Sequence, residues 1–134
     1  MFVLHAHVTI VPGGEAAFEA LARRLVVATL RAEPGVRRYE YFRLAEPRQY
    51  LTVLAFEDHA AFIEHQASEH HVALTDAMKP LMEHISLERL DPIAPGPSDE
   101  PGAIAEVPSD VLEDRRERYR ARYPFPVASW WGIV

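Results

Sequence analysis

The sequence predicts an α+β protein of the ferredoxin-like kind, in which a four-stranded antiparallel sheet carries helices on one face. Two observations predict this class. Strand-like and helix-like segments follow one another in the order β-α-β-β-α-β, with the second helix broken in two. The segment 50–56 is also apolar at nearly every position, so we expect both faces of this strand to be buried. The simplest way to bury the face without helices is to pack it against the same face of a second copy, which predicts a dimer.

The first strand and the first helix follow from composition and spacing. Residues 2–11 are rich in Val, Ile and Phe, and Pro12-Gly13-Gly14 ends them as a strand. Residues 15–32 form the predicted helix, because its apolar residues recur at three- and four-residue steps. The residues expected to share its buried face are Phe18, Leu21, Leu25 and Ala28. Glu33-Pro34-Gly35 ends the helix, since proline cannot continue it.

Three more strands and a broken helix complete the domain. The strands are predicted at 36–44, 50–56 and 81–90, with a turn at 45–48 between the first two. Asp58 is a good N-cap for a helix that runs to about Ala67. A second short helix starts at Ser68 or Glu69 and runs to about Lys79, where Pro80 closes it.

Proline divides the chain into three parts. Residues 1–91 form the predicted domain, and residues 92–109 form an irregular linker rich in Pro and Gly. Residues 110–134 form a C-terminal extension, with a helix starting near Asp110 and an aromatic tail. Such a helix is marginal alone and needs to dock on the domain. Four aromatic residues are too many to leave in water: Tyr123, Phe125, Trp130 and Trp131.

Composition excludes several kinds of function. The chain has no cysteine, which excludes disulfides, thiolate metal sites and a cysteine nucleophile. With 14 basic and 20 acidic residues the net charge is −6, so neither nucleic acid nor a membrane surface is an expected partner. No apolar run approaches the ~20 residues that span a bilayer, and the first residues do not resemble a signal peptide. We therefore expect a cytoplasmic protein.

Histidine is the residue type best suited to proton transfer here. Six of the seven histidines lie in two places. His5 and His7 share one face of the first strand, and the other four lie in or beside the broken helix. We expect His59 and His71 to be solvated or to cap helix ends. A metal site is the disfavoured interpretation for the group His65, Glu69, His70 and His71, because the helix break does not force convergence.

The segment from Phe56 to His70 resembles a signature of the antibiotic biosynthesis monooxygenase family. An aromatic residue ends the third strand, an acidic turn and an apolar helix follow, and H-x-x-S-x-H closes the pattern at His65, Ser68 and His70. The strand order and both Pro-Gly pairs match as well. The resemblance covers residues 1–91 and implies a dimeric ferredoxin-like α+β barrel with a pocket between sheet and helices.

The resemblance also implies a set of site residues. His65 would act as the base, and His70 as its partner or as an oxyanion donor. The residues expected to bind the substrate are Thr52, Leu54, Phe56, Phe62, Tyr39, Tyr41 and Leu74. Trp130 either closes over this pocket or covers apolar surface with Trp131. His5 and His7 would point to the dimer face, and Leu4, Ala6 and Val8 would point inward.

Members of this family include cofactor-free oxygenases, so the resemblance implies a cofactor-independent monooxygenase. It would oxidise a small, planar, hydrophobic substrate of the aromatic polyketide or quinol type with O2, through a substrate carbanion or phenolate. No metal and no cofactor are expected. Two alternatives stay open, because Thr52 and Phe56 stand where the anthrone-oxygenase branch has Asn and Trp. One is an isomerase, cyclase or lyase that moves protons without oxygen. The other is a non-catalytic, small-molecule-binding dimer.

Overall fold

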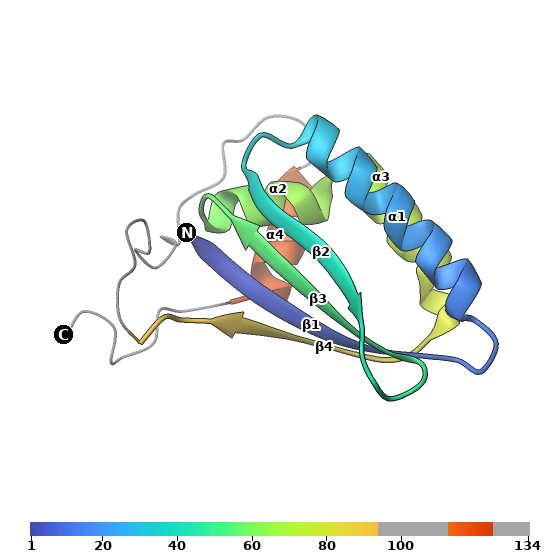
Figure 1. The fold of residues 1–134 in the computed structure, drawn as a ribbon. Helices are drawn as coiled ribbons and strands as arrows, with labels where there is room; N and C mark the ends of the chain where they lie inside the picture. Colours follow the sequence, from blue (N-terminus) through green and yellow to red (C-terminus); the bar gives the residue numbers. More distant parts are fainter. Residues whose placement is uncertain (94–112, 125–134) are drawn as a thin grey trace.

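Helices gather on one face of a four-stranded antiparallel sheet in the computed structural model, which describes residues 1–93 and 113–124 (Figure 1). The strands lie in the spatial order β2-β3-β1-β4. Their bounds are Phe2–Ile10 for β1, Val36–Arg43 for β2, Gln49–Phe56 for β3 and Met82–Leu90 for β4. The β-α-β-β-α-β arrangement and the ferredoxin-like α+β class are thereby confirmed.

The helices begin and end close to the predicted residues. They are α1 (Glu15–Ala32), α2 (His59–Ala67), α3 (Glu69–Met78) and α4 (Glu113–Arg122), with a 3-10 turn η1 at Lys79–Leu81. Asp58 caps α2, because its carboxylate accepts the Ala61 N–H at 2.8 Å. Ser68 caps α3 in the same way, accepting the His71 N–H at 3.3 Å.

The buried face of α1 is rotated slightly from the predicted one. Phe18 and Leu25 are buried as expected, whereas Leu21 and Ala28 are only half-buried. Ala22 and Thr29 are buried in their place. This stripe advances by three or four residues at a time, so the next position on it after Thr29 is Glu33.

The two faces of β1 differ as the sequence predicts. Leu4, Ala6 and Val8 are buried beneath the helices. His5 and His7 lie on the opposite face, where His5 Nε2 is 3.0 Å from a carboxylate oxygen of Glu88. This outer face is built partly from apolar side chains of β3.

The connection between α1 and β2 lies directly against α2. A Cβ placed on Gly35 would be 2.7 Å from the Cβ of Ala61, which is closer than two carbon atoms can pack. The Gly35 carbonyl also accepts the Glu57 N–H at 2.8 Å. Glycine is therefore required here for close approach, and this approach holds the end of α1 against α2.

The C-terminal helix α4 docks on α2. Arg116 forms an ion pair with Glu64 at 2.7 Å, and Arg115 donates to the Ala67 carbonyl at 2.6 Å. The predicted linker and the tail aromatics Phe125, Trp130 and Trp131 lie outside the described residues, apart from 92 and 93 of the linker. Within the described ranges, no helix combines the length and apolarity that a membrane span requires.

Candidate functional site

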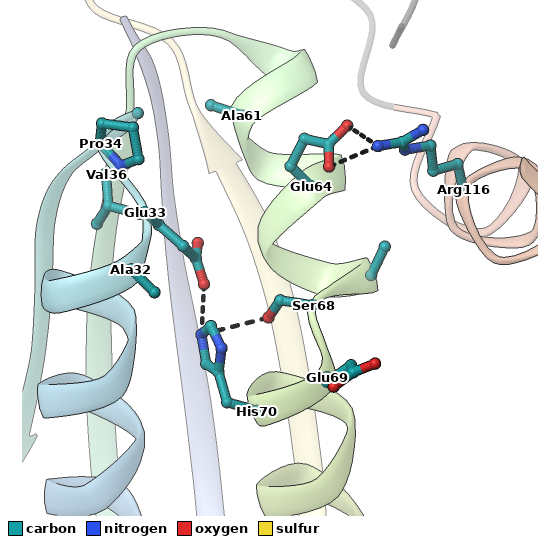
Figure 2. Close-up of a pocket in the computed structure, with 12 residues that line it drawn as sticks. Ala32, Glu33, Pro34, Val36, Ala61, Glu64, Ser68, Glu69, His70 and Arg116 are labelled. Carbon is teal, nitrogen blue, oxygen red and sulfur yellow. Dashed lines mark hydrogen bonds and ion pairs between the residues drawn. The ribbon is translucent and has the colours of Figure 1, made fainter. Parts of the chain in front are cut away.

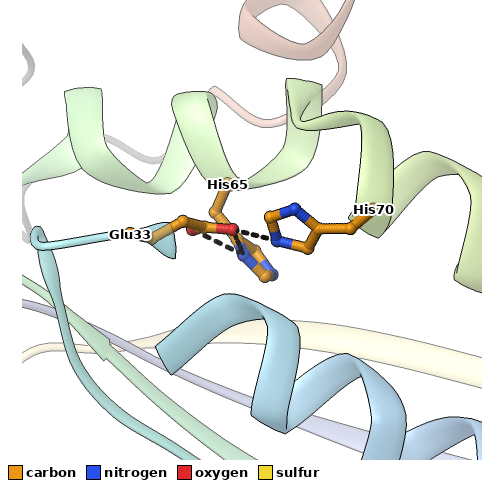
Figure 3. A group of neighbouring side chains, drawn as sticks. All are labelled: Glu33, His65 and His70. Atoms are coloured by element: carbon orange, nitrogen blue, oxygen red, sulfur yellow. Dashed lines mark hydrogen bonds and ion pairs between the residues drawn. The ribbon is translucent and has the colours of Figure 1, made fainter. Parts of the chain in front are cut away.

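Three side chains from separate elements meet at the junction of α1, α2 and α3 (Figure 3). One oxygen of the Glu33 carboxylate lies 2.9 Å from His65 Nδ1, and the other lies 3.1 Å from the same nitrogen. The second of these oxygens is also 2.6 Å from His70 Nε2. Both histidines named by the sequence thus converge on one carboxylate, which sequence analysis did not identify.

Glu33 reaches the histidines because of its place in the chain. It follows the last residue of α1 and precedes Pro34, and proline disfavours the helical conformation in the residue before it. The Glu33 backbone is accordingly extended, with φ −119° and ψ 94°. The close packing of Gly35 on Ala61 then holds this segment beside α2.

The break between α2 and α3 brings His65 and His70 together. In a continuous helix, side chains five residues apart point about 140° away from each other. Ser68 ends α2 in an extended conformation, and its hydroxyl donates to the His65 carbonyl at 2.8 Å. Ser68 Oγ also lies 3.3 Å from His70 Nε2, so the same serine that breaks the helix contacts the second histidine.

The Glu33 carboxylate fixes which ring nitrogens carry protons. A carboxylate only accepts, so the neutral rings donate from Nδ1 of His65 and from Nε2 of His70. Nε2 of His65 and Nδ1 of His70 are then left with free lone pairs. The His65 side chain is fully buried, and its Nε2 is buried without a hydrogen-bond partner.

Two further histidines are buried, contrary to the expectation that they are solvated or cap helix ends. The His71 ring lies 4.4 Å from that of His65, and burial holds the pKa of His71 well below its usual value. His59 packs edge-on to Phe2, and burial likewise lowers the pKa of His59. His59 is covered in part by Phe2 of β1, and His71 packs on His65 across the break between α2 and α3.

A cavity of 490 Å³ borders the group (Figure 2). Glu33 and His70 form part of one wall, and the Glu64–Arg116 ion pair forms part of another. The remaining lining is largely small and apolar: Ala32, Pro34, Gly35, Val36, Ala61 and Ala67, with Ser68 and Glu69. The volume is that of a small-molecule site. His65 does not line this cavity.

A second cavity of 630 Å³ lies between α1 and the strands β2 and β3. Its aromatic lining includes Tyr39 and Tyr41, whose hydroxyl groups are 3.1 Å apart. Burial raises the pKa of both phenols, so they are neutral at physiological pH. The Tyr39 ring stands edge-on to His65, with ring centroids 5.0 Å apart, so Tyr39 touches both this cavity and the histidine.

The predicted substrate-binding residues fall into three groups. Tyr39 and Tyr41 line the second cavity. Five others line neither cavity: Thr52, Leu54, Phe56 and Phe62 are buried, and Leu74 is half-buried. Trp130 lies outside the described residues. Phe56 does contact the cluster, since its ring lies 5.3 Å from that of His65.

The described residues also contain a group able to hold a metal ion. It differs from the group considered from the sequence, which was His65, Glu69, His70 and His71. Ligand atoms of Glu33, His65 and His70 all lie within 4.8 Å of one another. Glu69 is exposed and does not belong to this group, and neither does His71. Two sequence features could have identified Glu33 as a site residue. It continues the buried stripe of α1 four residues after Thr29, and it directly precedes a proline.

Comparisons with known proteins agree with this architecture. The family model described as antibiotic biosynthesis monooxygenase matches residues 1–77. A solved structure from Shewanella oneidensis is 32% identical, with a TM-score of 0.62, over 66% of this chain and 87% of its own.

Two further solved structures are similar over the same part of the fold. One from Pseudomonas aeruginosa is 26% identical, with a TM-score of 0.64, over 69% of this chain and 94% of its own. An antibiotic biosynthesis monooxygenase is 25% identical, with a TM-score of 0.65, over 70% of this chain and all (100%) of its own. No curated protein matches the chain.

Proposed function

The chain belongs to the antibiotic biosynthesis monooxygenase family, and on that premise we propose that it oxidises a small, planar, hydrophobic substrate with O2 and without a cofactor. The substrate class is a quinol or an aromatic polyketide. One observation carries the proposal: the His70 imidazole, held by Glu33 at 2.6 Å, borders a cavity of 490 Å³. A positioned imidazole beside a largely apolar hollow suits proton removal from such a substrate.

In this proposal His70 is the base and His65 is a positioning residue, which exchanges the roles expected from the resemblance. His70 lines the cavity, whereas His65 is fully buried and lines neither cavity. With its Nε2–H donated to Glu33, His70 accepts the substrate proton at Nδ1. The carboxylate of Glu33 then stabilises the imidazolium that forms, and His65 keeps that carboxylate in place from the other side.

The oxygen chemistry needs only the substrate and O2. The substrate anion transfers one electron to O2, and the two radicals combine to a hydroperoxide on the substrate carbon. Loss of water from the hydroperoxide converts the reacting CH2 group, which a quinol carries in its keto form, into a carbonyl. One oxygen atom enters the product and the other leaves as water. All four electrons come from the substrate carbon, so the reaction requires no external reductant.

The test is oxygen uptake by the chelator-treated protein with a panel of quinols and anthrones. We expect His70→Ala to lower kcat/KM by about 10²-fold or more. The matched control, His84→Ala, changes an exposed histidine of β4 and should leave the rate unchanged. Turnover without oxygen uptake would favour the isomerase, cyclase or lyase alternative. Binding without turnover would favour the non-catalytic dimer.

We also propose a homodimer formed through the outer face of the sheet. Leu51 and Val53 of β3 are only half-buried there, and Phe42 of β2 is 41% exposed. A second copy of this face would cover all three side chains. A cytoplasmic location, without nucleic acid or membrane as partner, completes the proposal.

A further inference from the structure

We infer that Glu33, His65 and His70 bind a divalent first-row transition-metal ion whose open coordination positions face the 490 Å³ cavity. Each residue offers one ligand atom, and the three atoms lie within 4.8 Å of one another. They come from the end of α1, the last turn of α2 and the first turn of α3. The inference does not rest on the proposed oxygenation.

The present distances are close to those that an ion requires. The Glu33 carboxylate oxygens lie 2.9 Å from His65 Nδ1 and 2.6 Å from His70 Nε2. With bonds of about 2.0–2.2 Å to nitrogen and oxygen, neighbouring ligand atoms lie roughly 3.0–3.5 Å apart. The third pair, His65 Nδ1 and His70 Nε2, lies within 4.8 Å. Small side-chain movements would therefore admit an ion among the three atoms, with each ring proton moving to the other ring nitrogen.

Charge favours a cation at this point. The Glu33 side chain is only 13% exposed, and its ion-pair partners in the described part of the chain are the two imidazoles. No Lys or Arg of residues 1–93 or 113–124 forms an ion pair with it. A divalent ion would supply the positive charge that a half-buried carboxylate otherwise lacks.

The kind of ligand indicates the kind of ion. Two imidazole nitrogens and one carboxylate oxygen suit Zn2+, Fe2+ or Co2+ better than Mg2+ or Ca2+, which prefer oxygen alone. Three protein ligands leave at least one position open, as in catalytic rather than structural sites. Since Glu33 and His70 line the cavity, water or a ligand in that cavity can reach the open position. The fully buried His65 would bind the ion on the side away from the cavity.

The experiment titrates the chelator-treated, full-length protein with Co2+ and with Zn2+. We expect one ion per chain, visible d–d absorption bands for Co2+, and Zn2+ affinity in the micromolar range or tighter. Glu33→Gln and His70→Ala should each weaken binding by about 100-fold or more, because each removes a ligand.

Two controls separate this site from incidental binding. His5 and His7 form an imidazole pair on the outer face of the sheet, with ring centroids 5.1 Å apart, so the double variant His5→Ala/His7→Ala removes a pair of histidines away from the proposed site. Glu69→Gln removes an exposed carboxylate that lines the same cavity. Both variants should bind Zn2+ as the unmodified chain does.

A rise in thermal midpoint on adding Zn2+, present in the unmodified chain and absent in His70→Ala, provides a readout independent of colour. If Glu33→Gln does not fold, His70→Gln replaces it, because His70 is partly exposed and tolerates change.

Binding that survives in the Glu33 and His70 variants but disappears in the His5/His7 variant would overturn the inference. So would the absence of Co2+ bands in the unmodified chain. Oxygen uptake by metal-free protein tests the proposed function separately.

Discussion

The Glu33 carboxylate and the His70 imidazole lie 2.6 Å apart, although 37 positions separate them in the sequence. Glu33 follows α1, and His70 belongs to the first turn of α3. Their contact depends on two local features, the proline that ends α1 and the serine that breaks the second helix. The site is therefore as sensitive to the backbone around these residues as to the side chains themselves.

Gly35→Ala should destabilise the fold and move Glu33 away from the histidines. The added Cβ would lie 2.7 Å from Ala61 Cβ, and overlap of this kind costs about 1–3 kcal/mol. Urea unfolding measures the loss. The double variant Gly35→Ala/Ala61→Gly restores the space, so it should be more stable than the sum of the two single changes predicts. Strict additivity would show that the two residues do not touch.

The buried His59 should make the protein less stable as the pH falls. Burial lowers the pKa of His59 in the folded protein below 6.5, its value in the unfolded chain. As the pH falls below 6.5, the unfolded chain binds a proton that the folded protein excludes. Stability then decreases by at most about 1.4 kcal/mol per pH unit, down to the folded-state pKa.

His59→Leu should make the curve of unfolding free energy against pH less steep below about 6.5, while buried His71, whose pKa is also lowered, retains its own contribution. The control His84→Gln, which changes an exposed histidine, should retain the slope of the unmodified chain. The same slope in His59→Leu and in the unmodified protein would show that His59 does not contribute. Its neighbours Phe2 and Phe62 would still pack against the leucine.

Arg116→Ala should loosen α4 from α2. The Arg116 side chain is almost fully buried, and its partner Glu64 is half-exposed, so we expect a loss of about 1–2 kcal/mol. Amide hydrogen exchange should become faster in α4 than in α1. Arg118→Ala removes an exposed cation from the same helix and should leave exchange unchanged. Equal exchange in both variants would mean that Arg116 does not hold α4.

Val53→Lys should convert the proposed dimer into a monomer. Val53 lies on the outer face of β3, paired with His5 of β1, and a lysine there would place a charge in the interface. Sedimentation velocity measures the change. Arg24→Gln, on the exposed surface of α1, serves as the control. A monomer in the unmodified chain would overturn the dimer proposal directly.

The elements themselves could be predicted from the sequence, because the signals are local. Asp58 and Ser68 cap the helices that follow them, and Pro34 ends the helix before it. Each signal acts within one turn of chain. The alternation of β1 is also local, which explains why Leu4 and His5 face opposite sides as expected.

The candidate site could be predicted only in part. His65 and His70 were found because they occupy a short pattern, but Glu33 is 32 residues from His65. Its side chain was assigned to ending a helix, and no pattern within one element connects it to a histidine. The burial of His59 could not be predicted for the same reason, since its neighbour Phe2 comes from the other end of the domain sequence. His71 is buried against His65, which the break between α2 and α3 brings beside it.

The proton positions on His65 and His70 test the central claim most directly. Long-range 1H–15N NMR of the metal-free protein above pH 7.5 distinguishes the two neutral tautomers of each ring. We predict a proton on Nδ1 of His65 and on Nε2 of His70, and altered tautomer populations for both rings in Glu33→Gln. A proton on Nδ1 of His70, or spectra that Glu33→Gln leaves unchanged, would contradict a carboxylate that holds and orients both rings.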